Sequence, residues 1–435
     1  MSIEVISVVL FVTLFVFLLS GLPVAFALGG VAFLFGILFI GPNFVYIAFS
    51  QTFRFATSYL FISVPMFVYM ANILAASGVA EQLYDAVVHF IGFIKGGLAV
   101  VSVVCCTIMA AMVGISTAGV MTMGVLAYPE MVRYNYDRKL AAGSIAAAGA
   151  LGSLIPPSLT LVVLGALTET SVIALFAAGI LPGLLLAGLF IAYILVRCTI
   201  QPDMGPPIRQ QFTWGERMAS LKGLVLPAFL IAGILGGLFG SIFTATEASG
   251  VGAVGAFICA FINRRFNMKM FKKANINALR TTGMVMWLVF ASAAIGAVYS
   301  ATGASQLVKD ILAGANIPPL AVIGIMQVIL IFLGCFMDPT GIILICIPIF
   351  TPVVKAMGFD IIWFLILFEV NLEMGFLTPP FGFNLFVLRG ILDPPMTMGE
   401  LYRAAVLFIL VQATGLAILM LFPNIALILP QLITR

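Results

Sequence analysis

Two short segments place paired prolines beside glycine and hydroxyl side chains within apolar stretches: GSLIPPS at residues 152–158 and GFLTPPF at residues 375–381. Proline inside a helix removes a backbone hydrogen bond and clashes with the preceding turn, at a cost of about 3 kcal/mol. In lipid, such breaks persist only where the freed backbone is buried or lines a cavity. The freed carbonyl groups can bind a cation, and the N-terminus of the following half-helix can face an anion. Both segments therefore predict ligand binding at interrupted helices.

Two further polar segments interrupt apolar stretches. GISTAG at residues 114–119 lies in the middle of 97–131, and MDPTGI at 337–342 lies in the middle of 318–354. Small polar residues at such a position are typical of the tip of a re-entrant helical hairpin that lines a binding site. We expect each tip to lie beside the Pro-Pro break that follows it, so that one hairpin and one broken helix form one lobe of a midplane site.

The candidate ligands lie in these four segments and just after them. Hard oxygen ligands, including a carboxylate, suit Na⁺ better than a transition metal. Candidate Na⁺ ligands are Gly114, Gly152, Ser153, Pro156, Asp338, Gly341, Gly375, Thr378, Pro379 and Gly382. Candidate substrate contacts are Ser116, Thr117, Ser158, Thr340, Asn384 and Arg389.

Several charged groups near this predicted site have a second interpretation. Asp338 is a functional candidate because intramembrane acids are rare, but it could also cap the helix that starts near Thr340. Glu369 and Glu373 lie four residues apart on one helix face and could relay protons or ions, or simply face a wet crevice. Arg389 could attract an anionic substrate, or anchor the chain at the membrane surface by snorkelling.

Enzymatic chemistry is disfavoured by the motifs that are missing from the sequence. The HExxH, Walker A and GxSxG motifs do not occur, and the chain contains a single histidine, His89. A Ser-His-Asp triad cannot be assembled at the predicted midplane with that one histidine. The six cysteines sit in apolar context without metal-ligand spacing, which indicates packing residues.

The elements that must position these residues are apolar helices. Of the 435 residues, 63% are hydrophobic and 8% are charged, whereas soluble domains carry about a quarter charged residues. Long apolar runs recur along the chain and predict an all-α, multi-pass membrane protein. Expected spans are 3–20, 23–41, 60–77, 140–166, 172–196, 223–240, 246–262, 281–300, 359–388 and 401–422.

The two halves of the chain resemble each other. Pro156-Pro157 matches Pro379-Pro380 at an offset of 223 residues, and Pro129 matches Pro352 at the same offset. This spacing predicts two repeats, 1–197 and 223–435, joined by a polar linker at 198–222. In the first repeat we expect a scaffold at 1–58, hairpin 1 at 97–131 and a broken helix at 140–166. The second would have a scaffold at 223–280, hairpin 2 at 318–354 and a broken helix at 359–388.

The basic residues indicate how the repeats are oriented. If 97–131 is a hairpin with both ends on one side, all but four of the 20 basic residues fall on that side, which the positive-inside rule assigns to the cytoplasm. Each repeat then has five spans plus one hairpin, and five is an odd number. The repeats are therefore predicted to be inverted, with a cytoplasmic linker and both chain termini in the periplasm.

Four stretches together resemble one known family: ANILAASGVAEQLYD, the GISTAG tip, GALGSLIPPSL and EMGFLTPPFGFNLFVLRG. They are similar to the large membrane subunit of tripartite ATP-independent periplasmic (TRAP) transporters, the DctM family. The resemblance covers essentially the whole chain and is most specific at TPPFGFNLFVLRG. We expect a separate chain, not one fused to the small subunit.

The resemblance implies an elevator-type importer in the bacterial inner membrane, coupled to two or more Na⁺ ions. Substrates in that family are mostly organic acid anions, such as C4-dicarboxylates, sialic acid, sugar acids and keto acids. Implied partners are a small four-helix membrane subunit, a periplasmic substrate-binding protein and membrane lipid; neither an organic cofactor nor nucleic acid is expected. Two alternatives stay open, a stand-alone divalent-anion/sodium symporter and a proton-coupled carrier through Glu369 and Glu373.

Overall fold

A computed structural model describes residues 3–20, 22–208, 212–303, 317–335, 337, 339–380 and 382–433. Within these ranges every regular element is a helix, which confirms the predicted all-α class. Seven of the described helices are long and apolar enough to cross a membrane. Together with exposed apolar side chains such as Phe229 and Leu279, they confirm a multi-pass membrane protein.

The first half of the chain, up to the polar linker, contains ten α-helices among its described residues. They are α1 (Ile3–Leu19), α2 (Val24–Phe39), α3 (Asn43–Ala56), α4 (Ser63–Ala76), α5 (Val79–Ile91), α6 (Gly97–Val113), α7 (Ser116–Arg133), α8 (Arg138–Ala150), α9 (Leu159–Thr168) and α10 (Val172–Ile200).

The remaining described helices begin within the linker and continue to the C-terminal end. They are α11 (Trp214–Ser220), α12 (Lys222–Phe239), α13 (Ala245–Ile262), α14 (Met268–Ala301), α16 (Pro319–Gly334), α17 (Pro339–Ala356), α18 (Ile361–Gly375), α19 (Phe383–Arg389), α20 (Met398–Leu421) and α21 (Asn424–Ile433).

Helix α14 differs from the sequence-based expectation. The predicted span begins at residue 281 and leaves the basic stretch 263–280 outside it. In the structure, most of the basic stretch and the whole span belong to one continuous helix of 34 residues. Nothing in the sequence around Arg280 interrupts helical hydrogen bonding, because the stretch contains no proline and its first glycine is Gly283. The change from basic to apolar composition is therefore a change of environment along one helix.

Both Pro-Pro segments lie between helices. Helix α8 ends at Ala150 and α9 begins at Leu159, while α18 ends at Gly375 and α19 begins at Phe383. Side-chain caps fix where three of these helices start: Asp137 accepts from the Leu140 amide (2.9 Å), Ser158 from the Leu161 amide (3.2 Å) and Asp360 from the Ile362 amide (2.8 Å). Each cap satisfies a backbone donor that an interrupted helix would otherwise leave unpaired.

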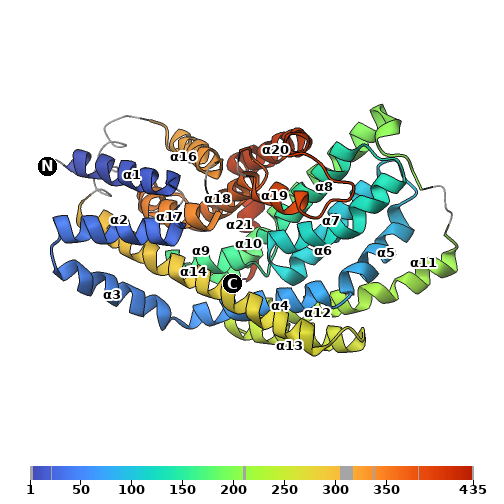
Figure 1. The fold of residues 1–435 in the computed structure, drawn as a ribbon, viewed down its shortest axis with the longest axis horizontal. Coiled ribbons are helices and arrows are strands. Elements are labelled where there is room, and N and C mark those ends of the chain that lie inside the picture. Colours follow the sequence, from blue (N-terminus) through green and yellow to red (C-terminus); the bar gives the residue numbers. More distant parts are fainter. Residues whose placement is uncertain are drawn as a thin grey trace.

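The helices form two groups around α14, which runs obliquely through the molecule (Figure 1). Helices α2, α3 and α4 pack against α14, and α13 packs against α4. On the other side, α8 packs against α6, α7 and α20. The sequence of α8 is almost entirely Ala, Gly and Ser after Lys139, and its residues from Leu140 onward are buried. These small side chains let neighbouring helices approach closely, as is usual in membrane bundles.

Candidate functional site

The tip between α6 and α7 contacts the first Pro-Pro break through its backbone. Gly114 has φ +68°, a conformation that favours glycine, and its carbonyl accepts a hydrogen bond from the Leu159 amide (3.2 Å). A Cβ at Gly114 would lie 1.9 Å from the Pro157 carbonyl oxygen. A Cβ at Gly152 would lie 3.0 Å from the Ile115 carbonyl. The two glycines therefore make the contact between tip and break possible.

Hydroxyl groups satisfy part of the backbone freed at the first break. The Ser153 hydroxyl donates to the Ala150 carbonyl (3.1 Å), and the Ser158 hydroxyl donates to the Ser153 carbonyl. Ser158 also caps α9 and is fully buried. Its hydroxyl is thus engaged on both sides within the fold, so Ser158 holds the shape of the break.

The second break is supported in a similar way. The Thr378 hydroxyl donates to the Met374 carbonyl (2.7 Å), and the Tyr402 hydroxyl donates to the Pro380 carbonyl (2.6 Å). Gly375 packs against Gly334 at the end of α16, where a Cβ on Gly334 would lie 2.9 Å from the Gly375 Cα. The end of α16 and the second break therefore meet backbone to backbone, as the first tip and first break do.

Polar side chains join the two halves where these breaks face each other. Asn384 and Ser116 exchange hydrogen bonds of 3.0 and 3.1 Å, and both residues are buried. The Ser153 hydroxyl also lies 3.4 Å from Oε1 of Glu373. We call these four residues the lobe seam. Asn384 was expected to contact substrate; the structure shows it holding α19 against the tip of α7.

Replacing Asn384 with leucine should destabilise the protein by about 1–3 kcal/mol, because the buried Ser116 hydroxyl loses its partner. The change is measured as a lower thermal unfolding midpoint of the purified protein. Asn43→Ala, at an exposed asparagine on α3, serves as the control and should leave the midpoint unchanged. An Asn384→Leu protein as stable as the wild type would contradict the role of the lobe seam.

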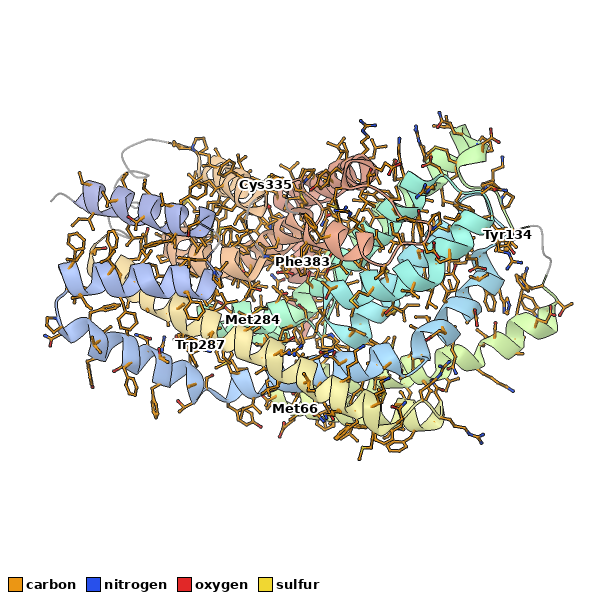
Figure 2. All side chains as sticks on the ribbon, in the orientation of Figure 1. Met66, Tyr134, Met284, Trp287, Cys335 and Phe383 are labelled. Atoms are coloured by element: carbon orange, nitrogen blue, oxygen red, sulfur yellow. The ribbon has the colours of Figure 1, made fainter. Side chains whose placement is uncertain are left out.

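The hairpin tip opens into a cavity of about 790 Å³. One wall is formed by the tip together with Ser153, Thr160 and Thr340. The other wall is formed by residues of α4 and α14. Figure 2 labels Phe383 on α19 and Met284 on α14, two lining residues, near the centre of the molecule. The cavity therefore lies between the group of helices that carries the breaks and the group that packs around α14.

One wall of the cavity is the N-terminus of α7. Its N-cap residue is Ile115, which provides no side-chain cap, and Ser116 and Thr117 form the first helical turn. An uncapped N-terminus presents backbone N–H groups and the positive end of the helix dipole. Such an end favours an anionic group, and the Thr117 hydroxyl can add a hydrogen bond there.

The opposite wall carries two cations that the sequence reasoning did not place in the site. Lys273 and Arg280 line the cavity from α14, seven residues apart and so on the same helix face, with Asn277 between them. Asn277 donates to the Asn72 side chain of α4 (3.2 Å). Within the described ranges, neither cation forms an ion pair. The sequence signal for them is the spacing Lys-x₃-Asn-x₂-Arg, whereas their basic character alone indicates only orientation in the membrane.

The other sequence-predicted residues divide by their positions. Gly114, Ser116, Thr117, Ser153 and Thr340 line the cavity. Asp338 lies outside the described residues. Arg389 is exposed at the end of α19 and, like Ser158 and Asn384, is absent from the cavity lining. The lining also does not include Gly152, Pro156, Gly341, Gly375, Thr378, Pro379 or Gly382.

Comparisons with known proteins identify the family of the chain. Residues 11–425 match the family model "Tripartite ATP-independent periplasmic transporter, DctM component". The chain is 34% identical to the C4-dicarboxylate TRAP transporter large permease protein DctM of Pseudomonas aeruginosa, over 91% of this chain and 92% of that one. It is 32% identical to the ectoine/5-hydroxyectoine TRAP transporter large permease protein UehC of Ruegeria pomeroyi, over 85% and 86%.

A solved structure, the YdaH transporter of Alcanivorax borkumensis, has a similar fold. The TM-score is 0.62 at 14% identity, covering 92% of this chain and 97% of that one. The likeness in fold, the family match across nearly the whole sequence and the large-permease relatives at 30% identity or more point to one conclusion. The chain is a transporter permease, not an enzyme, and belongs to the DctM component family of tripartite ATP-independent periplasmic transporters.

Proposed function

We propose that this permease imports a small organic acid anion together with Na⁺. The observation that carries the proposal is the cavity: the uncapped N-terminus of α7 faces Lys273 and Arg280 across it. The lining also contains one carboxylate, Glu81, so the two cations and the positive end of α7 leave the cavity net positive, which favours an anionic substrate. C4-dicarboxylates, sialic acid, sugar acids and keto acids are the classes to test, and the P. aeruginosa relative is named for the first of them.

Sodium coupling is supported by the oxygen atoms at the two breaks. Hydroxyl groups of Ser153 and Thr378 lie beside backbone carbonyl groups there, in buried or half-buried surroundings. Carbonyl and hydroxyl oxygens are ligands that suit a hard monovalent cation. We therefore retain the predicted Na⁺ ligands at the tips and breaks, with two or more ions carried together with the substrate.

In the proposed elevator mechanism the breaks and hairpins move as a unit. Hydrogen bonds of the lobe seam link the two lobes, which supports their movement as one unit. The scaffold would be 1–58 with 223–280, which includes the part of α14 that carries the two cations. Sliding of the lobes along α14 would carry the anion to the opposite side of the membrane, with the inverted repeats giving two related end states.

The proposal includes partners and a location. A small four-helix subunit would pack on the scaffold within the bacterial inner membrane. A periplasmic binding protein would deliver the anion to the outer face, the side on which the distribution of basic residues predicts both chain termini. Family membership supports both partners, since the family is named as tripartite.

Replacing external Na⁺ with K⁺ should abolish uptake. The measurement uses proteoliposomes containing the permease, its small subunit and its binding protein, with labelled succinate, N-acetylneuraminate and pyruvate offered in turn. Without external Na⁺, the proposed cation sites at the two breaks stay empty, and no Na⁺ gradient is present to drive transport. Uptake that continues equally in K⁺ would refute sodium coupling, and uptake by the permease alone would favour a stand-alone symporter.

A further inference from the structure

Helix α18 carries two acidic residues in the interior of the protein. Glu369 and Glu373 lie one turn apart on it, and neither side chain is accessible to solvent. They therefore do not face a wet crevice, which was one of the two interpretations that the sequence left open. Burying an ionised carboxylate without a partner is so costly that proteins pair it with a cation or with several donors.

The two carboxyl groups differ in their partners. Glu373 accepts hydrogen bonds from the Ser153 hydroxyl (3.4 Å) and from the Gln412 amide (3.2 Å). Both carboxyl oxygens of Glu369 are buried without a hydrogen-bond partner among the described residues. If Glu369 is ionised, its negative charge has no partner among the described residues. If it is protonated, its O–H donor has none.

A second, independent group points into the same place. The Gln412 side chain of α20 is fully buried, and its amide nitrogen bonds Glu373, but its carbonyl oxygen has no partner among the described residues. The Trp363 indole of α18, also buried against α20, does find a partner there, because it donates to the Leu419 carbonyl (2.9 Å). The Gln412 amide lies against Glu373, and Glu369 is one turn from Glu373 on α18. The unsatisfied oxygens of Glu369 and Gln412 are acceptors that suit a hard cation.

We propose that the two carboxylates, together with the carbonyl oxygen of Gln412, bind a monovalent cation at the lobe seam. The donors to Glu373 stabilise that carboxylate, and the cation supplies the counter-charge that Glu369 lacks. This site is additional to the ions expected at the tips and break carbonyls. The choice of Na⁺ as the cation rests on the proposed sodium coupling.

The position of the site gives the ion a structural consequence. Ser153 belongs to the first break, and Glu373 lies two residues before Gly375 at the second break. An ion at the two carboxylates keeps Glu373 ionised, and an ionised carboxylate is the stronger acceptor for the Ser153 hydroxyl that links it to the first break. Its binding adds stability to the assembled pair of lobes in proportion to its affinity.

The test measures equilibrium ²²Na⁺ binding to the purified permease, and its unfolding midpoint in Na⁺ and in K⁺ at equal ionic strength. Glu369→Gln keeps the shape of the side chain and removes its charge. We expect it to bind about one Na⁺ fewer per chain and to show a smaller Na⁺-dependent rise in midpoint. In K⁺ its midpoint should equal or exceed that of the wild type, since an uncompensated buried charge has been removed.

Two further variants keep the test decisive. Gln412→Leu should weaken Na⁺ binding at this site, and the matched control Glu169→Gln, at an exposed carboxylate, should leave Na⁺ binding unchanged. Unaltered Na⁺ stoichiometry and affinity in both Glu369→Gln and Gln412→Leu would overturn the site while leaving sodium-coupled uptake intact. Conversely, if uptake ignores Na⁺ but Glu369→Gln still binds less of it, the site stands and the proposed coupling fails.

Discussion

Replacing Gly114 with alanine is expected to abolish substrate uptake. The new Cβ would lie 1.9 Å from the Pro157 carbonyl oxygen, far inside any contact that real atoms make. That oxygen is backbone and cannot swing aside as a side chain could. Alanine is also disfavoured at the φ of +68° that Gly114 adopts. The tip must therefore move away from the break and lose the hydrogen bond from Leu159 to Gly114.

The measurement is uptake by proteoliposomes containing the complete transporter, with the unfolding midpoint of the purified permease recorded in parallel. Gly188→Ala provides the control, since a Cβ at this position in α10 would meet nothing within 4 Å. That variant should transport normally and be as stable as the wild type or slightly more so, because alanine favours helix. Normal uptake by Gly114→Ala would show that the contact between tip and break is not needed for transport.

Local chemistry explains which parts of this arrangement could be predicted from the sequence. Proline lacks the N–H that continues a helix, and α8 and α18 end shortly before their Pro-Pro pairs, although α10 and α17 continue through separate prolines. Glycine followed by a serine and a threonine likewise indicates an interruption, and α6 gives way to α7 at Gly114. Apolar composition similarly leads to an all-α membrane protein without knowledge of the packing.

Tertiary contacts decide the features that sequence reasoning missed. Ser158 and Asn384 look like ligands because they are polar residues beside a break, yet hydrogen bonds within the fold engage them both. In the sequence, Lys273 is only one of several basic residues that indicate membrane orientation. Its neighbours in the chain do not show that it lies near the tip of α7. That position depends on how α14 crosses the molecule and packs on α4, which only the assembled helices determine.

Neutralising both cations on α14, by Lys273→Gln with Arg280→Gln, should raise the KM for an anionic substrate by roughly thirty-fold. Hydrogen bonds to charged groups contribute about 1.5–3 kcal/mol, and a net loss of about 2 kcal/mol corresponds to that factor. The binding protein and its delivery of substrate are left unchanged. Initial uptake rates at increasing concentrations of the substrate and its binding protein give the KM, and each single variant should have an intermediate value.

The neighbouring lysine provides a matched control for this prediction. Lys272 is exposed on α14 as Lys273 and Arg280 are, but it does not line the cavity, so Lys272→Gln removes an equal charge from outside the site. Its KM should stay within about twofold of the wild type, because a charge outside the cavity makes no hydrogen bond to the bound anion and acts on it only through solvent. Added choline chloride at constant Na⁺ should raise the wild-type KM by screening the two cations, and should affect the double variant less. Equal KM values in the double variant and in Lys272→Gln would mean that general surface charge, and not these two residues, attracts the anion.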